Sequence, residues 1–211
     1  MKALLLSGGI ESTCLAYWKR PDLCVTVDYG QVCADTEIDT SKAICTRLKL
    51  RHETIKAFAG GSFGLLGGKK PLDHDKPEYW PFRNQFLATI AAMNLQRRGI
   101  REIWFGSVKS DKKFLDGAPE FFKRLDALTS AQEGRLRIKA PAITLTTEKL
   151  IIESKTPRAV LGATFSCHRS SLPCGDCPGC WKQFRLLYSG GKSRPGPIRA
   201  RDIALISEIS F

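Results

Sequence analysis

The chain has 211 residues, of which 33 are Lys or Arg and 21 are Asp or Glu, so its formal net charge is +12. This length permits one substantial domain with its own core, or one domain with a small annex. The positive charge favours an anionic partner such as a nucleotide, a phosphate or a nucleic acid. No apolar run approaches the roughly 20 residues that span a bilayer, and the apolar start is too short for a secretory signal. We therefore expect a cytoplasmic protein without a membrane segment.

Alternating strand and helix patterns run along most of the chain. Short apolar runs bounded by turn residues predict strands, and apolar residues at helical spacing predict helices. Each expected strand is followed by an expected helix, and this alternation occurs five times. The strands are expected at 2–6, 22–28, 51–58, 101–108 and 135–145, and the helices at about 12–18, 34–50, 84–99, 119–134 and 146–156.

This alternation predicts an α/β fold with a doubly wound, mostly parallel five-stranded sheet and helices on both faces. A ligand of such a sheet binds outside the carboxyl ends of its strands. We assign residues 1–160 to this domain, 161–188 to a small cysteine-rich subdomain and 189–211 to a C-terminal tail. Residues 59–81 are rich in glycine and proline and interrupt the alternation, so we expect a long loop or lid there.

A Ser7-Gly8-Gly9 turn joins the first strand to the first helix. Backbone N–H groups and the positive end of the helix dipole converge at such a turn, and glycines let the backbone approach an anion closely. Ser7 and Ser12 add hydroxyl donors. A bare Ser-Gly-Gly turn also serves as a plain connection, so the spacing alone leaves both interpretations open. The glycine patterns of the P-loop and of the dinucleotide fingerprint are both absent.

Four of the eight cysteines crowd into the segment CHRSSLPCGDCPGC. In a reducing compartment they are not expected to form a disulfide framework. Their spacing is C-x6-C-x2-C-x2-C, and cysteines on tight turns deliver the four thiolates that tetrahedral zinc requires. We therefore predict a closed, structural zinc site with the ligands Cys167, Cys174, Cys177 and Cys180.

The other four cysteines lie in the first quarter of the chain. Cys14, Cys24 and Cys45 fall within helical or apolar patterns, and we expect them to be buried packing residues. The pattern around Cys33 does not assign it a role.

Several short segments, taken in chain order, resemble one enzyme family. LLLSGGIES resembles the pyrophosphate-binding loop S-G-G-x-D-S (the PP-loop) of the N-type ATP pyrophosphatases, which break ATP between its α and β phosphates. TVDYGQ, PFRNQFL, FGSVKSD, APEFFKRL and the cysteine cluster follow in the order of the 7-cyano-7-deazaguanine synthase (QueC) family of queuosine biosynthesis. The resemblance covers about Ala3 to Phe184. It implies an adenine nucleotide α-hydrolase-like, Rossmann-type sheet and a zinc ion bound by the four cysteines.

The resemblance implies an ATP-dependent carbon–nitrogen ligase. Its substrate would be 7-carboxy-7-deazaguanine, whose carboxylate attacks the α-phosphate of ATP to give an acyl adenylate and pyrophosphate. Ammonia would then form an amide, which a second ATP would convert to the nitrile. Mg²⁺ is implied because the leaving pyrophosphate is highly charged. A homodimer is the assembly that the family suggests.

The resemblance also implies an ATP site, with Ser7, Glu11, Ser12 and Arg83 as its catalytic residues. Considered without the family, Arg83 is an ordinary surface arginine beside a helix-capping asparagine. The residues implied to bind ATP are Leu6, Ser7, Gly8, Gly9, Ile10, Glu11, Ser12, Thr13, Asp28, Tyr29, Arg83 and Asn84.

Two acidic residues follow the fourth strand, and the resemblance places them near the substrate. Asp111 and Asp116 would bind the N–H groups of the base or a magnesium ion. As loop acids without that context, both are ordinary turn residues.

Two departures from the family pattern leave other functions open. Glu11 stands where the family loop has Asp, and KKFLDGA retains Asp116 but lacks the Cys-Arg pair of the family's Gly-Tyr-Pro-Asp-Cys-Arg segment. A divergent member could instead couple the activated deazaguanine to an amine of a protein partner, as relatives in anti-phage defence operons suggest. The charge also allows a tRNA-modifying or nucleic-acid-binding PP-loop protein, although no appended RNA-binding domain is evident.

Overall fold

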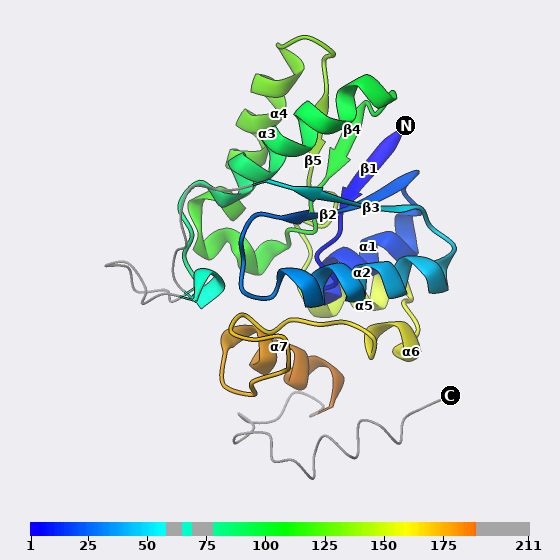
Figure 1. Ribbon diagram of the computed structural model, residues 1–211, viewed down its shortest axis with the longest axis vertical. Coiled ribbons are helices and arrows are strands. Elements are labelled where there is room, and N and C mark those ends of the chain that lie inside the picture. The colour runs from blue at the N-terminus through cyan, green and yellow to red at the C-terminus, as the bar shows by residue number, and fades with distance from the viewer. Residues whose placement is uncertain (58–64, 69–77, 189–211) are drawn as a thin grey trace.

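The computed structural model describes residues 1–57, 65–68 and 78–188 (Figure 1). Most of the lid expected at 59–81 lies outside the described residues, as does the whole tail from 189 onward. Within the lid, a short 3-10 helix is described at Leu65–Gly67. No helix of the described part of the chain is long and apolar enough to cross a membrane.

Five strands form one parallel sheet in the order β3-β2-β1-β4-β5. This topology confirms the predicted doubly wound fold. The strand order changes direction between β1 and β4, so the loops that follow these two strands diverge and leave a crevice at the carboxyl edge. The strands are β1 (Lys2–Leu5), β2 (Leu23–Asp28), β3 (His52–Lys56), β4 (Glu102–Trp104) and β5 (Arg137–Lys139).

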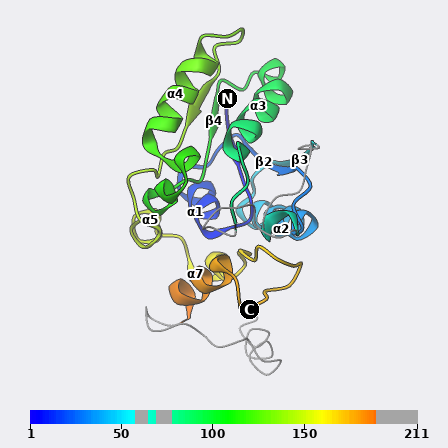
Figure 2. The same cartoon turned by 90° about the vertical axis from the view of Figure 1, so that its left-hand side faces the viewer.

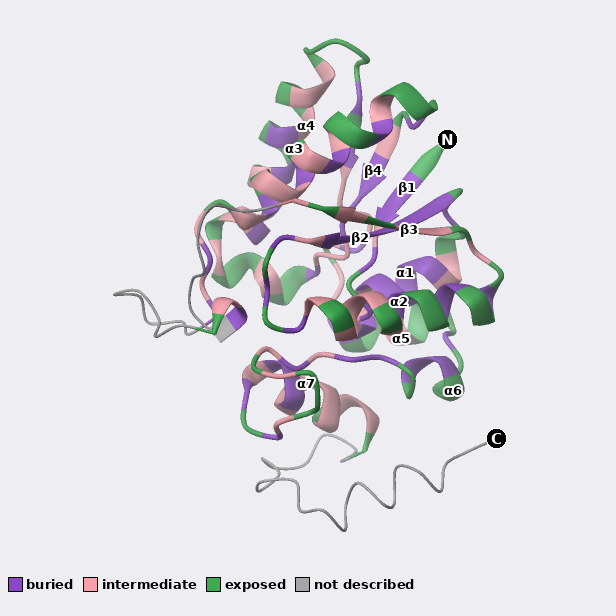
Figure 3. Ribbon diagram, in the orientation of Figure 1, coloured by how far each residue is buried: buried purple, intermediate pink, exposed green. Residues whose placement is uncertain are grey.

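Helices cover both faces of the sheet, and each face has its own apolar core. Figure 3 shows buried residues concentrated in the central strands and on the helix sides that face them. One face carries α1 (Ile10–Lys19), α2 (Ala34–Leu48) and α5 (Thr147–Ser154). The other carries α3 (Arg83–Leu95), extended by a 3-10 turn at Gln96–Arg98, and α4 (Pro119–Ser130).

Two strands are shorter than the apolar runs that predict them. β4 has three residues within the expected 101–108, and β5 has three within the expected 135–145. After β4 the chain passes so close to α1 that a Cβ on Gly106 would lie 3.0 Å from the backbone nitrogen of Ser12. After β5, Pro141 cannot donate to the ladder, and the chain turns. Both runs contribute buried residues beyond the paired part, such as Phe105 and Ala142, but only their first parts pair with a neighbouring strand.

The described C-terminal residues form a small lobe beneath α1, α2 and α5, which two views at right angles both show (Figures 1 and 2). It contains α6 (Arg158–Leu161) and α7 (Pro178–Leu187). Leu186 and Leu187 of α7 pack against the core that α1, α2 and α5 share. The backbone N–H of Phe165 donates to the carbonyl of Gly8 at 2.9 Å, so this lobe contacts the turn after β1 directly.

Candidate active site and metal centre

The turn after β1 is shaped by a glycine in the left-handed region. Gly8 has φ +71°, and a Cβ there would lie 2.9 Å from Cγ2 of Thr40. Gly9 is the N-cap of α1, without a side chain to accept from the first N–H groups of the helix. Ser12 closes the turn, since its Oγ lies 3.4 Å from Oγ of Ser7 and donates to the carbonyl of Gly9 at 3.2 Å. The turn therefore presents helix N–H groups and two hydroxyls to a ligand.

Two adjoining cavities, of about 260 and 290 Å³, lie at the carboxyl ends of β1, β2 and β4. The first is the more polar and extends to the C-terminal lobe, at Ser166 and Lys182. The second is lined by apolar residues at the strand ends, including Val25 and Phe105. We call the pair the cleft. The residues that line both of its cavities are Ser7, Glu11, Glu37, Arg83, Asn84, Ser107, Asp111 and His168.

Arg83 and Asn84 begin α3 at the wall of the cleft. Asn84 is buried, and Asp116 holds it twice: the Asp116 carboxylate accepts from the Asn84 backbone at 3.2 Å, and its carbonyl accepts from the Asn84 amide at 2.8 Å. Tyr29 packs edge-on against Trp80, with ring centroids 5.0 Å apart. Burial raises the pKa of Tyr29, although the nearby Arg83 opposes the shift.

Asp111 and Asp116 both line the first cavity, and both also hold the chain in place. The Asp111 carboxylate accepts from the backbone N–H of Val108 at 3.0 Å, and burial raises its pKa. Gly117 fits tightly here, because a Cβ on it would lie 2.3 Å from the carbonyl oxygen of Asp111. The two acids therefore occupy fixed positions at the wall of the first cavity.

Glu11 lies on the first turn of α1, between two partners from distant segments. Thr147, at the start of α5, donates its hydroxyl to the Glu11 carboxylate at 2.7 Å. Lys182 of α7 forms an ion pair with the same carboxylate. The longer side chain that replaces the family's Asp is therefore held by two partners at one carboxylate oxygen, Oε1.

Some residues implied to bind ATP do not present their side chains to the cleft. Ile10 and Thr13 are buried in the core beneath the turn, with 1% and 0% of their surface exposed. Asp28 lines neither cavity and accepts from the backbone N–H of Gly30 at 3.2 Å. Leu6 lines the second cavity. Ile10 and Thr13 can therefore shape the turn only through their backbone.

Sequence reasoning missed two partly buried titratable residues of the cleft. Glu37 of α2 accepts from the Gln31 amide at 2.8 Å, and burial raises its pKa to about 7. Burial lowers the pKa of His168 to about 4, and its buried Nδ1 has no hydrogen-bond partner among the described residues. Neither follows a predicted strand, so the sequence carried no signal for them. Gly106 and Ser107 do follow β4 directly, and their position after a strand could have indicated them.

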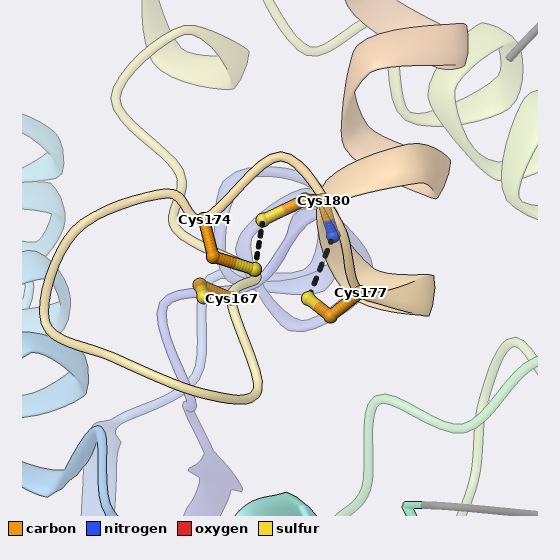
Figure 4. A group of neighbouring side chains, drawn as sticks. All are labelled: Cys167, Cys174, Cys177 and Cys180. Atoms are coloured by element: carbon orange, nitrogen blue, oxygen red, sulfur yellow. Dashed lines mark hydrogen bonds between the residues drawn. The ribbon is translucent and has the colours of Figure 1, made fainter. Parts of the chain in front are cut away.

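The four predicted metal ligands come together. The sulfur atoms of Cys167, Cys174, Cys177 and Cys180 all lie within 4.8 Å of one another (Figure 4). Four sulfurs around one zinc ion at about 2.3 Å lie about 3.8 Å apart, and the Sγ atoms of Cys174 and Cys180 are 4.0 Å apart. The cluster thus matches the size of a single tetrahedral ion.

Backbone N–H groups point at these sulfur atoms, as expected for thiolates. Arg169 donates to Cys167, Asp176 to Cys174, and His168 and Cys180 to Cys177, each at 3.4 Å. Hydrogen bonds from neighbouring thiols, that of Cys177 first, lower the pKa of Cys167. The donor set and its surroundings therefore fit a bound metal cation.

Cys33 acquires a position that its sequence pattern did not reveal. It is the N-cap of α2 and is 1% exposed, and its thiol donates to the carbonyls of Cys167 and Ser170 at 3.2 Å each. The neighbouring Cys167 thiol and burial together raise its pKa. Cys33 is thus a neutral thiol that holds the first loop of the cysteine cluster against the α/β domain.

The profile of the queuosine biosynthesis protein QueC matches residues 2–187. The chain belongs to the QueC family. Among curated relatives, the 7-cyano-7-deazaguanine synthase of a Nitratiruptor species is 28% identical over 95% of this chain and 100% of its own length. The enzyme of that name from Methanosarcina barkeri is 25% identical over 92% of this chain and 97% of its own.

A solved structure outside this family shares the fold of the QueC-family chain. The U34-tRNA thiolase NcsA from Methanococcus maripaludis, with its [4Fe-4S] cluster, superposes with a TM-score of 0.52 at 14% identity. The match covers 99% of this chain and 72% of that one. At such identity it supports the PP-loop type of fold alone.

The raised pKa of Glu37 predicts a pH-dependent cost of burying its carboxylate. Its ordinary pKa is 4.5 and its folded pKa is about 7, so between these values the folded chain binds more protons and the wild type loses stability as pH rises. Glu37→Gln stays neutral and can keep the Gln31 contact. Its stability relative to the wild type should rise by about 1–2 kcal/mol between pH 5 and pH 8.

Urea unfolding at several pH values measures this difference. Glu153→Gln, on the exposed face of α5, is the matched control and should follow the wild type at every pH. A constant offset between Glu37→Gln and the wild type would show that Glu37 is ionised in the folded chain at pH 5.

Proposed function

We propose that this chain is a 7-cyano-7-deazaguanine synthase that activates 7-carboxy-7-deazaguanine with ATP. Membership of the QueC family makes it an ATP-dependent ligase acting on a small molecule. The observation that carries the proposal is the Ser7-Gly8-Gly9 turn, which lies at the crevice of the sheet and opens into the cleft. A carboxylate oxygen of the substrate attacks the α-phosphorus, and the bond from that phosphorus to the bridging oxygen breaks, so pyrophosphate leaves.

The two cavities of the cleft suit the two halves of this reaction. The β and γ phosphates bind the N–H groups at the start of α1 and the hydroxyls of Ser7 and Ser12. The adenosine occupies the second cavity at the ends of β1 and β2, where Tyr29 and the apolar strand-end residues lie. Arg83 lines both cavities and is placed to neutralise charge that develops at the α-phosphate. Mg²⁺, with Glu11 or Asp111 among its ligands, would neutralise the leaving pyrophosphate.

The deazaguanine is expected in the first cavity, against the C-terminal lobe. Asp111 and Asp116 face it, and Glu37 adds a third carboxyl group. A guanine-like edge carries neighbouring N–H donors, which a carboxylate accepts. Ammonia then attacks the carbonyl carbon of the acyl adenylate and displaces AMP, giving the amide. The amide oxygen then attacks the α-phosphorus of a second ATP and displaces pyrophosphate. The C–O bond breaks, the oxygen leaves with AMP, and the nitrogen loses its two protons to give the nitrile.

Purified protein given ATP, 7-carboxy-7-deazaguanine and ammonium should release the nitrile, detected by mass spectrometry. Arg83→Met should reduce the rate about 100-fold, because one charge-stabilising donor is lost. Arg97→Met, in the 3-10 turn at the far end of α3, is the control and should match the wild type. Equal rates for the two variants would contradict the role of Arg83.

A second function is favoured by one observation, the missing Cys-Arg pair in the loop 109–118. A member that couples the activated deazaguanine to an amine on a protein would need a different loop there. This function would be supported, and the first overturned, if the assay above released no nitrile with ammonium but ATP and the acid were consumed once a partner protein was added. Binding of tRNA that weakens steeply with salt would instead support a nucleic-acid substrate.

We propose that the cysteine cluster holds one structural zinc ion. All four ligand positions come from the protein, which is the arrangement of closed sites. The compact sulfur cage favours a single ion over an iron–sulfur cluster, whose irons keep their thiolates farther apart. The ion would fix the loop 167–177 and the first turn of α7.

Metal analysis of the purified chain should find one zinc per chain and no visible absorption band. Cys177→Ser should lose most of the zinc, whereas Cys45→Ala, in the core of the α/β domain, should keep it. A brown protein with several irons and sulfide would contradict the single-ion site.

A further inference from the structure

Lys182 connects the C-terminal lobe to the turn after β1. It lies on α7, two residues beyond Cys180, so the helix that carries it starts within the cysteine cluster. Its ammonium group forms an ion pair with Glu11, on the first turn of α1. The two side chains are 33% and 17% exposed, so the pair is largely shielded from water. An ion pair that only attaches the C-terminal lobe to the α/β domain would show these same features. The surroundings of the pair therefore decide whether Lys182 also binds a ligand.

The pair lies in the wall of the cleft, beside the proposed phosphate site. Lys182 lines the first cavity together with Ser7, Gly9 and Glu11. It is also close enough to Asp111 to act on that carboxyl through its charge. An ammonium group on a flexible four-carbon stem can follow a phosphate over several ångströms. Lys182 therefore has the charge, position and reach to bind an anion held by the turn.

Glu11 does not depend on Lys182 for all of its contacts. The Thr147 hydroxyl donates to the same carboxylate at 2.7 Å. When Lys182 swings toward a phosphate, Glu11 keeps this bond, and the ammonium exchanges one anionic partner for another. The ion pair thus keeps the lysine near the turn while no nucleotide is bound.

We propose that Lys182 is a pyrophosphate-binding residue, which the metal-binding lobe supplies to the turn and which Glu11 holds until the ligand arrives. The proposal rests on the proposed function, since it assumes that the turn binds the β and γ phosphates. It makes the cysteine cluster necessary for nucleotide binding as well as for folding, because α7 carries both metal ligands and the lysine.

The test uses the full-length chain with its metal and measures the binding of inorganic pyrophosphate and of AMP by calorimetry. Lys182→Met keeps the apolar stem and removes the charge, and Lys182→Arg restores a cation. Arg185→Met is the matched control, because Arg185 lies one turn along α7 and pairs with Glu148 on the outer surface. Metal content and thermal unfolding are measured for each variant.

Lys182→Met should bind pyrophosphate about tenfold more weakly, while its affinity for AMP and its metal content match the wild type. Lys182→Arg should recover part of the pyrophosphate affinity, and Arg185→Met should behave as the wild type. Unchanged pyrophosphate affinity in Lys182→Met would overturn the proposal. Equal losses of affinity for pyrophosphate and AMP, or loss of the metal, would show that Lys182 only holds the lobe in place, and would also overturn the proposal. A wild type that binds neither ligand would contradict the proposed function itself.

Discussion

The left-handed backbone of Gly8 sets the shape of the turn after β1, and this turn joins the first strand to α1 and to the C-terminal lobe at the cleft. With φ at +71°, the chain turns sharply enough to begin α1 at Ile10 and to leave its first N–H groups facing outward. The same turn brings the Gly8 carbonyl to the N–H of Phe165. A side chain at position 8 would be strained and would meet Thr40. The shape of the proposed nucleotide site and the attachment of the C-terminal lobe therefore depend on one glycine.

The C-terminal lobe does more than cap the sheet. Its helices pack apolar residues on the α/β domain, but the buried cluster around its loops consists mainly of cysteines with Phe165 and, from the α/β domain, Cys33. The proposed zinc ion would hold the loops of this lobe, whose cysteine-lined centre has little else to bury. Once held, it forms one wall of the cleft with Ser166, His168 and Lys182. The cysteine cluster and the cleft are thus linked through α7.

The fold and the metal ligands could be predicted because both depend on local patterns. Alternating apolar runs indicated all five strands, and the cysteine spacing indicated the cluster. The ends of β4 and β5 could not be predicted. The apolar run of β4 continues past the point where a close approach to α1 ends the strand pairing, and that of β5 continues past a proline turn. The sequence also carried no signal for three residues of the cleft, Glu37, His168 and Lys182. They lie within helices or more than a hundred residues from the segments they meet, and no local pattern marks such residues. The roles of Ser7, Ser12, Arg83 and the two loop aspartates remain predictions.

The central claim is that this cleft joins the substrate carboxylate to the α-phosphate of ATP. It is tested most directly with 7-carboxy-7-deazaguanine carrying ¹⁸O in its carboxylate, followed by ³¹P NMR and mass spectrometry of the products. The account predicts AMP and pyrophosphate in equal amounts, with one ¹⁸O transferred to the phosphate of AMP. Release of ADP and phosphate, or AMP without label, would contradict it.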